Sequence, residues 1–488
     1  MKKVSIFVTM LLGILTLGFS QTSEWTVNNA ATWIDAVNGV RTGGNNRAHR
    51  ITLNGNISVP MSDSSTFGNA TGITVTIEGS GSITPSSNGA LLRVGSGQTI
   101  IARNLTLQGR NQNSASLVRI SSGGTFRMQG RASVTGNSSG EAVLTTGVFV
   151  NGGTFIMEDN SSVTNNSVTN NGGSAYGGGV RIDEGGTFTM LGGTISGNTV
   201  IAIGNESGVI GTAMGGGIYI EQNCTFNMRA GIITNNTASS KGELNAHSFG
   251  GGVCIDGGTF NMQGGTISAN IVSYDSRGRE GRTLTMGGGL PWSASGGGVD
   301  ISGANATFTM SGGTISGNTS NYRSGGVCSE GVFNMSGGKI SDNTAPASGA
   351  GVDVFGIFTM SGGEISDNKG GGVDVYDSFI MKGGKISGNG SESWLGGGVC
   401  VNRGSFIMDN GEISGNIAAH GGGVFVHNDG TFTKNGGIIY GNDSAQNLRN
   451  IDKNGKGHAI YEQGNDRWRN TTAGQAVGTD TYGFWMNN

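Results

Sequence analysis

The sequence is poor in proline, cysteine and charge. Of its 488 residues only 4 are Pro and 4 are Cys, and charged residues make up 12%, about half the usual share. So little Pro excludes collagen and Pro-rich linkers. The formal net charge is −3, which gives none of the basic character expected of a nucleic-acid-binding protein. Gly, with 95 residues, is the abundant residue instead.

Long apolar runs are rare too, apart from one at the N-terminus. Residues 4–19 are mostly apolar, follow two lysines and end in small residues before Gln21. This is the pattern of a secretory signal peptide, here residues 1–20, cleaved near Ser20. Because residues 4–19 are short for a membrane span and no later run is long enough, we expect a mature chain without a transmembrane segment. It would be secreted or held at the cell surface or outer membrane.

A short motif recurs along most of the chain. Phe is followed two residues later by Met in ten of eleven units, and each unit closes on Asn, often followed by a Gly-rich run and a Val-x-Val or Ile-x-Ile segment. Internal repeats of this length indicate a solenoid. The closing Asn residues are Asn137, Asn166, Asn198, Asn236, Asn270, Asn318, Asn343, Asn368, Asn389, Asn416 and Asn442.

Each element within a unit is too short for a helix. Phe-x-Met and Val-x-Val alternate with the period of a strand, and the shortest unit, from Phe358 to Phe379, has room for three short strands and three corners. Such a strip buries its apolar face only by stacking on copies of itself. The sequence therefore predicts an all-β fold, a single right-handed parallel β-helix of about 11 regular coils.

The repeated letters have structural interpretations. Inward Phe, Met and Ile should stack on their counterparts in the next coil, and the Asn row should form a side-chain ladder, with Asn in the left-handed conformation at a corner. Lys339, Glu364, Lys385 and Glu412 alternate in sign at one outward position, which predicts charge pairs between coils.

The two ends should be capped. We assign residues 21–60 to an N-terminal cap with a short helix over 29–40, residues 61–442 to the β-helix, and residues 443–488 to a partial coil and cap. Trp33, Ile34, Val37 and Val40 have near-helical spacing. At the far end, Trp468 and Trp485 are expected to cover the last coil.

These repeats resemble a known family. The cadence in "ISGNTVIAIGNESGVIGTAMGGGI" resembles the F-x-x-N…GGAI repeats of polymorphic outer-membrane proteins, with Ile in place of Phe and Val-x-Val in place of Ala-Ile. More broadly, residues 120–462 are similar to the parallel β-helix repeats of secreted bacterial adhesin-like proteins. The resemblance implies binding at a cell surface, with glycans or host molecules as partners. The same fold resembles pectate lyases and polygalacturonases, so polysaccharide lysis or hydrolysis is the alternative.

One constellation of residues suggests a ligand. In the Val-x-Val-x strand both x positions should point outward, and seven consecutive coils carry at least one carboxylate there, with aromatic residues among them. Carboxylates beside aromatic rings suit sugars, or a Ca²⁺ shared between coils, although the only calcium-loop-like sequence, from Asp452, lacks the ligands it needs. The candidate binding face comprises Asp183, Tyr219, Glu221, Asp256, Asp300, Glu330, Asp353, Phe355, Asp374 and Tyr376.

The face has other interpretations. It can be an ordinary solvated acidic surface, or Asp353 and Asp374 can work as an acid and base; the dispersed row favours binding over catalysis, and no cofactor is expected. A lesser alternative is binding to ice or another solid surface through a hydroxyl row. Its members are Ser196, Thr234, Ser268, Ser316, Ser341, Ser366, Ser387 and Ser414.

Variable length is concentrated on one edge of the repeat. Most insertions lie between Asn and the Gly run, so they should project from one edge beside the acidic strand. We expect ligand contacts from loops at 199–214 and 237–249 and from a longer loop bearing Arg277, Arg279, Arg282 and Trp292. The cysteines are expected to be free thiols, with Cys254, Cys328 and Cys400 in the outward series too far apart for disulfides.

Overall fold

A computed structural model describes residues 23–61, 64–139, 146–204, 210–242, 246–275, 294–346, 349–390, 392–455, 458–464, 467–470 and 472–473. The expected signal peptide lies outside the described residues. So do Arg277, Arg279, Arg282, Trp292 and Trp485.

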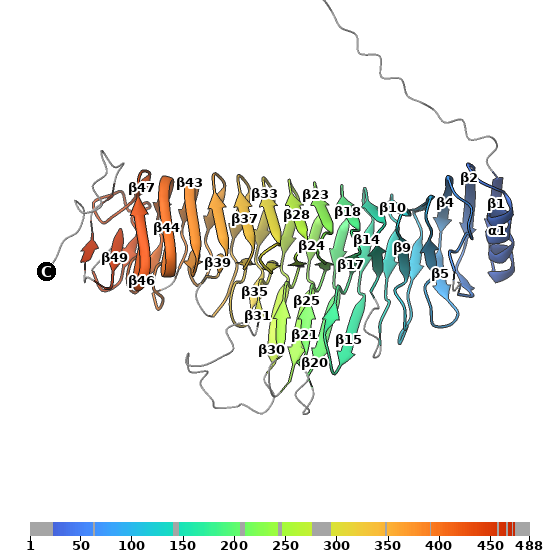
Figure 1. Cartoon of the computed structure of the whole chain (residues 1–488), viewed down its shortest axis with the longest axis horizontal. Coiled ribbons are helices and arrows are strands. Elements are labelled where there is room, and N and C mark those ends of the chain that lie inside the picture. Colours follow the sequence, from blue (N-terminus) through green and yellow to red (C-terminus); the bar gives the residue numbers. More distant parts are fainter. Residues whose placement is uncertain are drawn as a thin grey trace, which may run out of the picture.

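The described chain folds as the predicted right-handed parallel β-helix (Figure 1). Its coils stack along one axis and present three faces, which we name after their inward residues: the valine, phenylalanine and isoleucine faces. Every pairing between successive coils within these faces is parallel. The order follows from the sequence, since each coil runs Val-x-Val, corner, Phe-x-Met, corner, Ile, corner.

The strands of the valine face are β6 (Leu92–Val94), β9 (Val118–Ser121), β12 (Val148–Asn151), β17 (Val180–Asp183), β22 (Ile218–Ile220), β27 (Val253–Asp256), β32 (Val299–Ser302), β36 (Val327–Ser329), β39 (Val352–Val354), β42 (Val373–Val375), the starts of β44 (Val399–Ser414) and β46 (Val424–Lys434), and β49 (Ile460–Glu462). From β17 to β46, these strands follow the Gly-rich runs.

The phenylalanine face begins at the N-terminal end of the described chain, inside the segment assigned to the cap. Its strands are β1 (Ser23–Val27), β2 (Ala48–Asn54), β4 (Ile73–Ser80), β7 (Gln98–Arg103), β10 (Thr125–Gln129), β13 (Thr154–Met157), β18 (Thr187–Met190), β23 (Thr225–Met228), β28 (Thr259–Met262), β33 (Thr307–Met310), β37 (Val332–Met335), β40 (Ile357–Met360), β43 (Ser378–Ser387), and parts of β44 and β46.

The isoleucine face completes each coil. Its strands are β3 (Ile57–Val59), β5 (Ser82–Pro85), β8 (Thr106–Gln108), β11 (Ser133–Thr135), β14 (Ser162–Thr164), β19 (Thr194–Ser196), β24 (Ile232–Thr234), β29 (Thr266–Ser268), β34 (Thr314–Ser316), β38 (Lys339–Ser341), β41 (Glu364–Ser366), the ends of β43 and β44, and β47 (Ile438–Ile439).

Identical side chains stack on one another in the core, as predicted. From Phe155 to Phe432 successive Phe rings lie 4.5 to 4.9 Å apart with nearly parallel planes. The Met and Ile columns are buried beside them. One continuous hydrophobic cluster therefore runs the length of the stack.

The predicted Asn ladder is present. From Asn166 onward, each Asn donates its backbone N–H and its side-chain Nδ2 to Oδ1 of the next Asn, at 2.9 to 3.1 Å. The Nδ2 group also donates to a backbone carbonyl, as Asn318 does to Ile267. These buried amides are thus fully hydrogen-bonded, which is what buried polar groups require.

Two details of the ladder differ from the prediction. The left-handed residue is not the ladder Asn but the one before it, for example Asn165, Gly317 or Asp342. The last rung is Asn450 rather than Asn442, because Asn450 accepts from Asn416 while Asn442 donates its N–H to the carbonyl of Asn470.

Both ends of the stack are covered. Helix α1 (Ala30–Thr42) lies at the N-terminal end (Figure 1), and Trp33, Val37 and Val40 join the core as predicted. Ile34 does not, because its side chain points to solvent with 41% exposure. At the other end β49 forms the expected partial coil and pairs antiparallel with β50 (Arg467–Arg469), which holds the buried Trp468.

The insertions form a side lobe on one side of the stack (Figure 1). The predicted loops at 199–214 and 237–249 are mostly strands. One sheet contains β15 (Ser167–Asn171), β20 (Thr199–Ile203), β25 (Thr237–Lys241), β30 (Ile271–Asp275) and β35 (Thr319–Ser320), and the other contains β16 (Ala175–Tyr176), β21 (Thr212–Met214), β26 (His247–Phe249) and β31 (Ala294–Ser295). The lobe has its own small core of Val and Ala side chains.

The predicted charge pairs on the isoleucine face are formed. Lys339 Nζ lies 3.4 Å from Glu364, and Lys385 Nζ lies 3.0 Å from Glu412. All four side chains are at least one-third exposed, so each pair stabilises the fold only slightly. A further two-stranded sheet joins β45 (Ile417–Ala418) to β48 (Ile451–Asp452). In the part of the chain that the structure describes, no helix has the length and apolar character needed to cross a membrane.

Candidate functional site

The candidate binding face follows the outer side of the valine face. It has two columns: the first x position of each Val-x-Val-x strand forms the first column, and the second x position forms the second column. Both columns are in register from coil to coil as predicted; Asp353, for example, lies beside Asp374. The first column, however, is buried: each of Arg181, Tyr219, Cys254, Asp300, Cys328, Asp353, Asp374, Cys400 and Phe425 is at most 9% exposed. The expectation that these carboxylates form a solvated strip is therefore wrong, and so is the outward exposure of the three cysteines.

The corners that precede the valine-face strands from β17 onward explain this burial. From β17 to β46, a residue with positive φ lies four positions before the first outward residue, and in most of these coils it lies against that residue. Asp374 is covered by Gly349 of the preceding coil, where an added Cβ would lie 3.1 Å from Cβ of Asp374. A Cβ added to Gly296 would lie 2.7 Å from Cβ of Asp300, and one added to Gly421 would lie 2.7 Å from Cβ of Phe425. The chain therefore turns back across its own strand and shields the column from water.

Asp300 shows how a buried carboxylate is accommodated. It accepts hydrogen bonds from Ser295 Oγ at 2.7 Å and from Ser302 Oγ at 2.5 Å. Burial raises the pKa of Asp300 to about 7, although both hydroxyls oppose the shift. Its neighbours in the column are Cys254 and Cys328. Burial also raises the pKa of both thiols, so they are not reactive nucleophiles.

Asp353 and Asp374 form a second buried acidic group. Ser324 Oγ donates to Asp353 Oδ2 at 2.6 Å, while Oδ1 has no hydrogen-bond partner among the described residues. Burial and the adjacent Asp374 raise the pKa of Asp353 well above its usual value. The buried Arg323 supplies the opposing charge: burial works against its cation, but Tyr376, Asp353 and Asp374 outweigh burial, and its pKa is raised.

Aromatic side chains lie over this acidic group. The Phe355 and Tyr376 rings stack with centroids 4.4 Å apart. Arg323 lies 5.1 Å from the Tyr376 ring centre, and Tyr376 and Asn402 both donate to Asp374. The arrangement is a closed, internally bonded cluster, and its carboxylates are not presented to a ligand.

In the coils that carry the side lobe, the side chains of the second column remain partly exposed to solvent. Asp183 is an exception, because it is buried against Arg181, whose Nε lies 2.8 Å from Oδ2. Glu221, Asp256 and Glu330 are half-buried. Burial raises the pKa of both Glu221 and Glu330, with smaller contributions from Asp183 and Asp256 respectively.

A hollow of about 590 Å³ opens at this place. We name it the side-lobe hollow. Glu184, Gly185, Glu221, Gln222, Asn223 and Asp256 line it. Its lining residues come from the corners that follow β17 and β22 and from the last residue of β27. These strands are stacked on one another, so the hollow extends over three coils. Carboxylate and amide oxygens on adjacent coils can accept hydrogen bonds from hydroxyl or ammonium groups.

Tyr219 connects this hollow to the side lobe. Its hydroxyl donates to Asp256 Oδ2 at 2.7 Å, and its ring centre lies 4.9 Å from that of Tyr176 in β16. Arg181 packs against both rings, 4.8 Å from the Tyr176 centre and 5.6 Å from the Tyr219 centre. Tyr219 thus links Asp256, in the hollow, to Tyr176 in the lobe.

Sequence reasoning missed the lobe's contribution. Tyr176, Met214 and Phe249 occupy one column of the sheet β16-β21-β26-β31, in register and half-buried; we name it the apolar column. The available signal was an apolar residue directly before each Gly run, in "AYGGG", "AMGGG" and "SFGGG".

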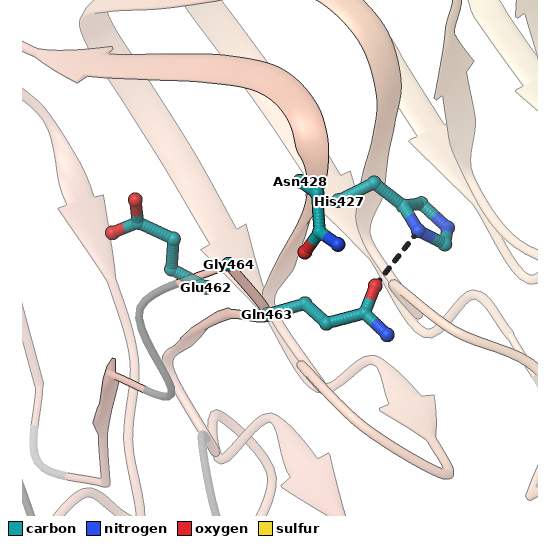
Figure 2. Close-up of a pocket in the computed structure, with 5 residues that line it drawn as sticks. All are labelled: His427, Asn428, Glu462, Gln463 and Gly464. Atoms are coloured by element: carbon teal, nitrogen blue, oxygen red, sulfur yellow. Dashed lines mark hydrogen bonds between the residues drawn. The ribbon is translucent and has the colours of Figure 1, made fainter.

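A second hollow, of about 450 Å³, lies at the C-terminal end of the same face. Its lining residues are His427, Asn428, Glu462, Gln463 and Gly464. Figure 2 shows His427 Nδ1 hydrogen-bonded to Gln463 Oε1, at 3.0 Å, with Glu462 on the other side. Its lining residues include one carboxylate and no Tyr, Trp or Phe, so it offers fewer contacts for a sugar.

The structure also describes the cysteines, the hydroxyl row and the residue types that could bind a metal ion. All four cysteines are free, as predicted. The hydroxyl row is in register on the isoleucine face, but Ser341, Ser366 and Ser414 are buried, so the row is not a uniform exposed array. Within the described ranges no group of three or more His, Cys, Asp or Glu side chains is arranged to hold a metal ion.

Comparisons with protein-family models, with curated proteins and with solved structures gave no match to this chain.

Proposed function

We propose that this chain is an exported, adhesin-like β-helix protein that binds glycans at the foot of its side lobe. The observation that supports this most strongly is the side-lobe hollow, where Glu221 and Asp256 lie beside the Tyr176–Tyr219 ring pair. Carbohydrates are bound by such combinations, because rings cover their C–H faces while carboxylates and amides accept from their hydroxyls. Repeat scaffolds carry binding sites on inserted segments of this kind.

Export and surface location are part of the proposal. They rest on the signal-peptide pattern of residues 1–20 and on the resemblance of the repeats to those of adhesin-like and polymorphic outer-membrane proteins. Fractionation of the native source, with an antibody against residues 294–346, would test location directly. Recovery of the chain from the cytoplasm, with residues 1–20 still attached, would contradict it.

The glycan-binding proposal is tested with the mature chain, residues 21–488, on a glycan array. We expect binding that is lost in Glu221→Gln and in Tyr176→Ala. Glu364→Gln is the matched control, because Glu364 lies on the isoleucine face and is 40% exposed. If a glycan binds and both hollow variants bind it as the parent does while remaining folded, the site lies elsewhere.

Polysaccharide lysis or hydrolysis remains the second candidate. It is favoured by the adjacent Asp353 and Asp374, since two neighbouring carboxyl groups can divide acid and base roles. Their burial, at 0% and 1% exposure, argues against it, because a polysaccharide cannot reach them with the corner at Gly349 in place. A depolymerisation screen on the same glycans separates the two, and an activity lost in Asp353→Asn would favour the enzyme.

A further inference from the structure

The residues that line the side-lobe hollow include three carboxylates, Glu184, Glu221 and Asp256. None of its lining residues is basic. Arg181, which packs beside it, is paired with Asp183 through its Nε and Nη2 atoms, and its positive charge also acts on Glu221 by opposing the rise in that residue's pKa. Among the described residues, no Lys, Arg or His lies within ion-pair distance of Glu184, Glu221 or Asp256. Such a surface attracts cations and repels anions.

Both groups of residues repeat along the solenoid axis. The apolar column contributes one side chain from each of β16, β21 and β26. The carboxylates of the hollow come from the same three coils: Glu184 directly after β17, Glu221 directly after β22, and Asp256 at the end of β27. Successive coils are about 4.8 Å apart, so both tracks extend over roughly 10 Å. A ligand that touches both tracks throughout must be an extended chain parallel to the axis.

We propose that the ligand is an oligosaccharide of amino sugars with free ammonium groups, lying along the axis. This rests on the proposed function and specifies its ligand. The sugar faces cover Tyr176, Met214 and Phe249, and the ammonium groups bond to Glu221 and Asp256. Charge-assisted hydrogen bonds of this kind are stronger than neutral ones, and cations also favour the faces of Tyr rings.

The first experiment measures affinity by titration calorimetry with the mature chain in low salt, at a pH where the amines are protonated. The probes are glucosamine oligomers of one to six units, matched N-acetylglucosamine oligomers and galacturonate oligomers. We expect affinity for glucosamine oligomers to rise until roughly three or four units, which span the three coils, and to fall with added salt. Equal affinity for the N-acetylated oligomers, preference for galacturonate, or no dependence on length would overturn the proposal.

Substitutions in the hollow and in the apolar column test which side chains contact the oligosaccharide. We expect Glu221→Gln and Asp256→Asn each to weaken binding of the glucosamine hexamer about 10-fold through loss of a charged contact, and Phe249→Ala to weaken it without changing its salt dependence. Glu364→Gln controls for loss of one surface carboxylate, and circular dichroism controls for folding. Unchanged affinity in all three hollow variants would overturn the assignment.

A lysine hexapeptide tests whether charge alone suffices. Weaker binding of this peptide than of the glucosamine hexamer supports a sugar ligand, whereas equal or tighter binding would overturn it in favour of a basic peptide. The failures are distinguishable. If no glycan of any class binds the chain, the proposed function fails; if neutral or acidic glycans bind at the hollow, the proposed function stands and only the amino-sugar assignment fails.

Discussion

Burial of the Asp300 carboxyl should make the stability of the fold depend on pH. Asp300 is 3% exposed and lies in the middle of the stack, and among the described residues two Ser hydroxyls donate hydrogen bonds to its carboxylate. Burial raises its pKa to about 7, whereas an unfolded chain should have an Asp pKa of about 3.9. The perturbation is Asp300→Asn, which keeps the shape of the side chain and cannot ionise.

The sign of the effect follows from the two pKa values. Between about pH 4 and pH 7 the folded chain holds a proton that the unfolded chain has released, so the free energy of unfolding decreases as the pH rises. The full difference corresponds to about 4 kcal/mol. We therefore expect Asp300→Asn to match the parent near pH 4 and to be more stable than the parent by up to about 4 kcal/mol at pH 8.

Urea unfolding of both proteins across this pH range is the measurement. Other buried carboxyls, such as Asp353, titrate in both proteins, so the difference between variant and parent isolates Asp300. Asp377→Asn, at an exposed position, controls for the loss of one charge. If the difference between Asp300→Asn and the parent is the same at every pH, Asp300 does not titrate as its surroundings predict, and the argument from burial is wrong.

Three further changes test the scaffold by thermal or urea unfolding. Asn318→Ala removes one rung and leaves several buried donors and acceptors unpaired, so it should cost about 4 kcal/mol; a loss below about 1 kcal/mol would show that the ladder is dispensable. Ser324 has a left-handed φ of 52° and donates to Asp353, so Ser324→Gly should be about 1 kcal/mol more stable than Ser324→Ala, because only Gly relieves the backbone strain; equal stabilities would contradict that strain. Lys339→Glu places two carboxylates side by side at Glu364 and should cost about 0.5 kcal/mol in low salt and less in high salt; no dependence on salt would contradict the charge pairing.

The repeated part of the fold was predictable because every coil obeys the same constraint. An inward side chain such as Phe358 must stack on its counterparts, so the same residue recurs at the same place. The periodicity of Phe, Met, Ile and Asn therefore predicts three faces, their register and the ladder. The charge pair between Lys339 and Glu364 followed from the same register.

The candidate site was harder to predict because it depends on the parts that do not repeat. Alternation within a strand assigns Asp300 and Asp353 to the outer side, which is correct, but it cannot reveal that a corner folds back over them. That corner is set by a left-handed residue, Gly296 or Gly349, several positions earlier. The lobe strand that carries Tyr176 is two residues long, too short for any periodicity.

Hydrogen bonding in the Asn ladder has a direction, and this makes each coil an interchangeable unit. Every rung from Asn166 to Asn416 donates toward the C-terminal end and accepts from the N-terminal side. Each coil therefore has a donating surface and an accepting surface, and these two surfaces are alike in every coil. The stretch from Phe358 to Ser378 is one complete turn of the chain, since Phe379 lies in register with Phe358. Removing or duplicating such a turn would join a donating surface to an accepting one. The length of the solenoid is therefore set by the number of coils.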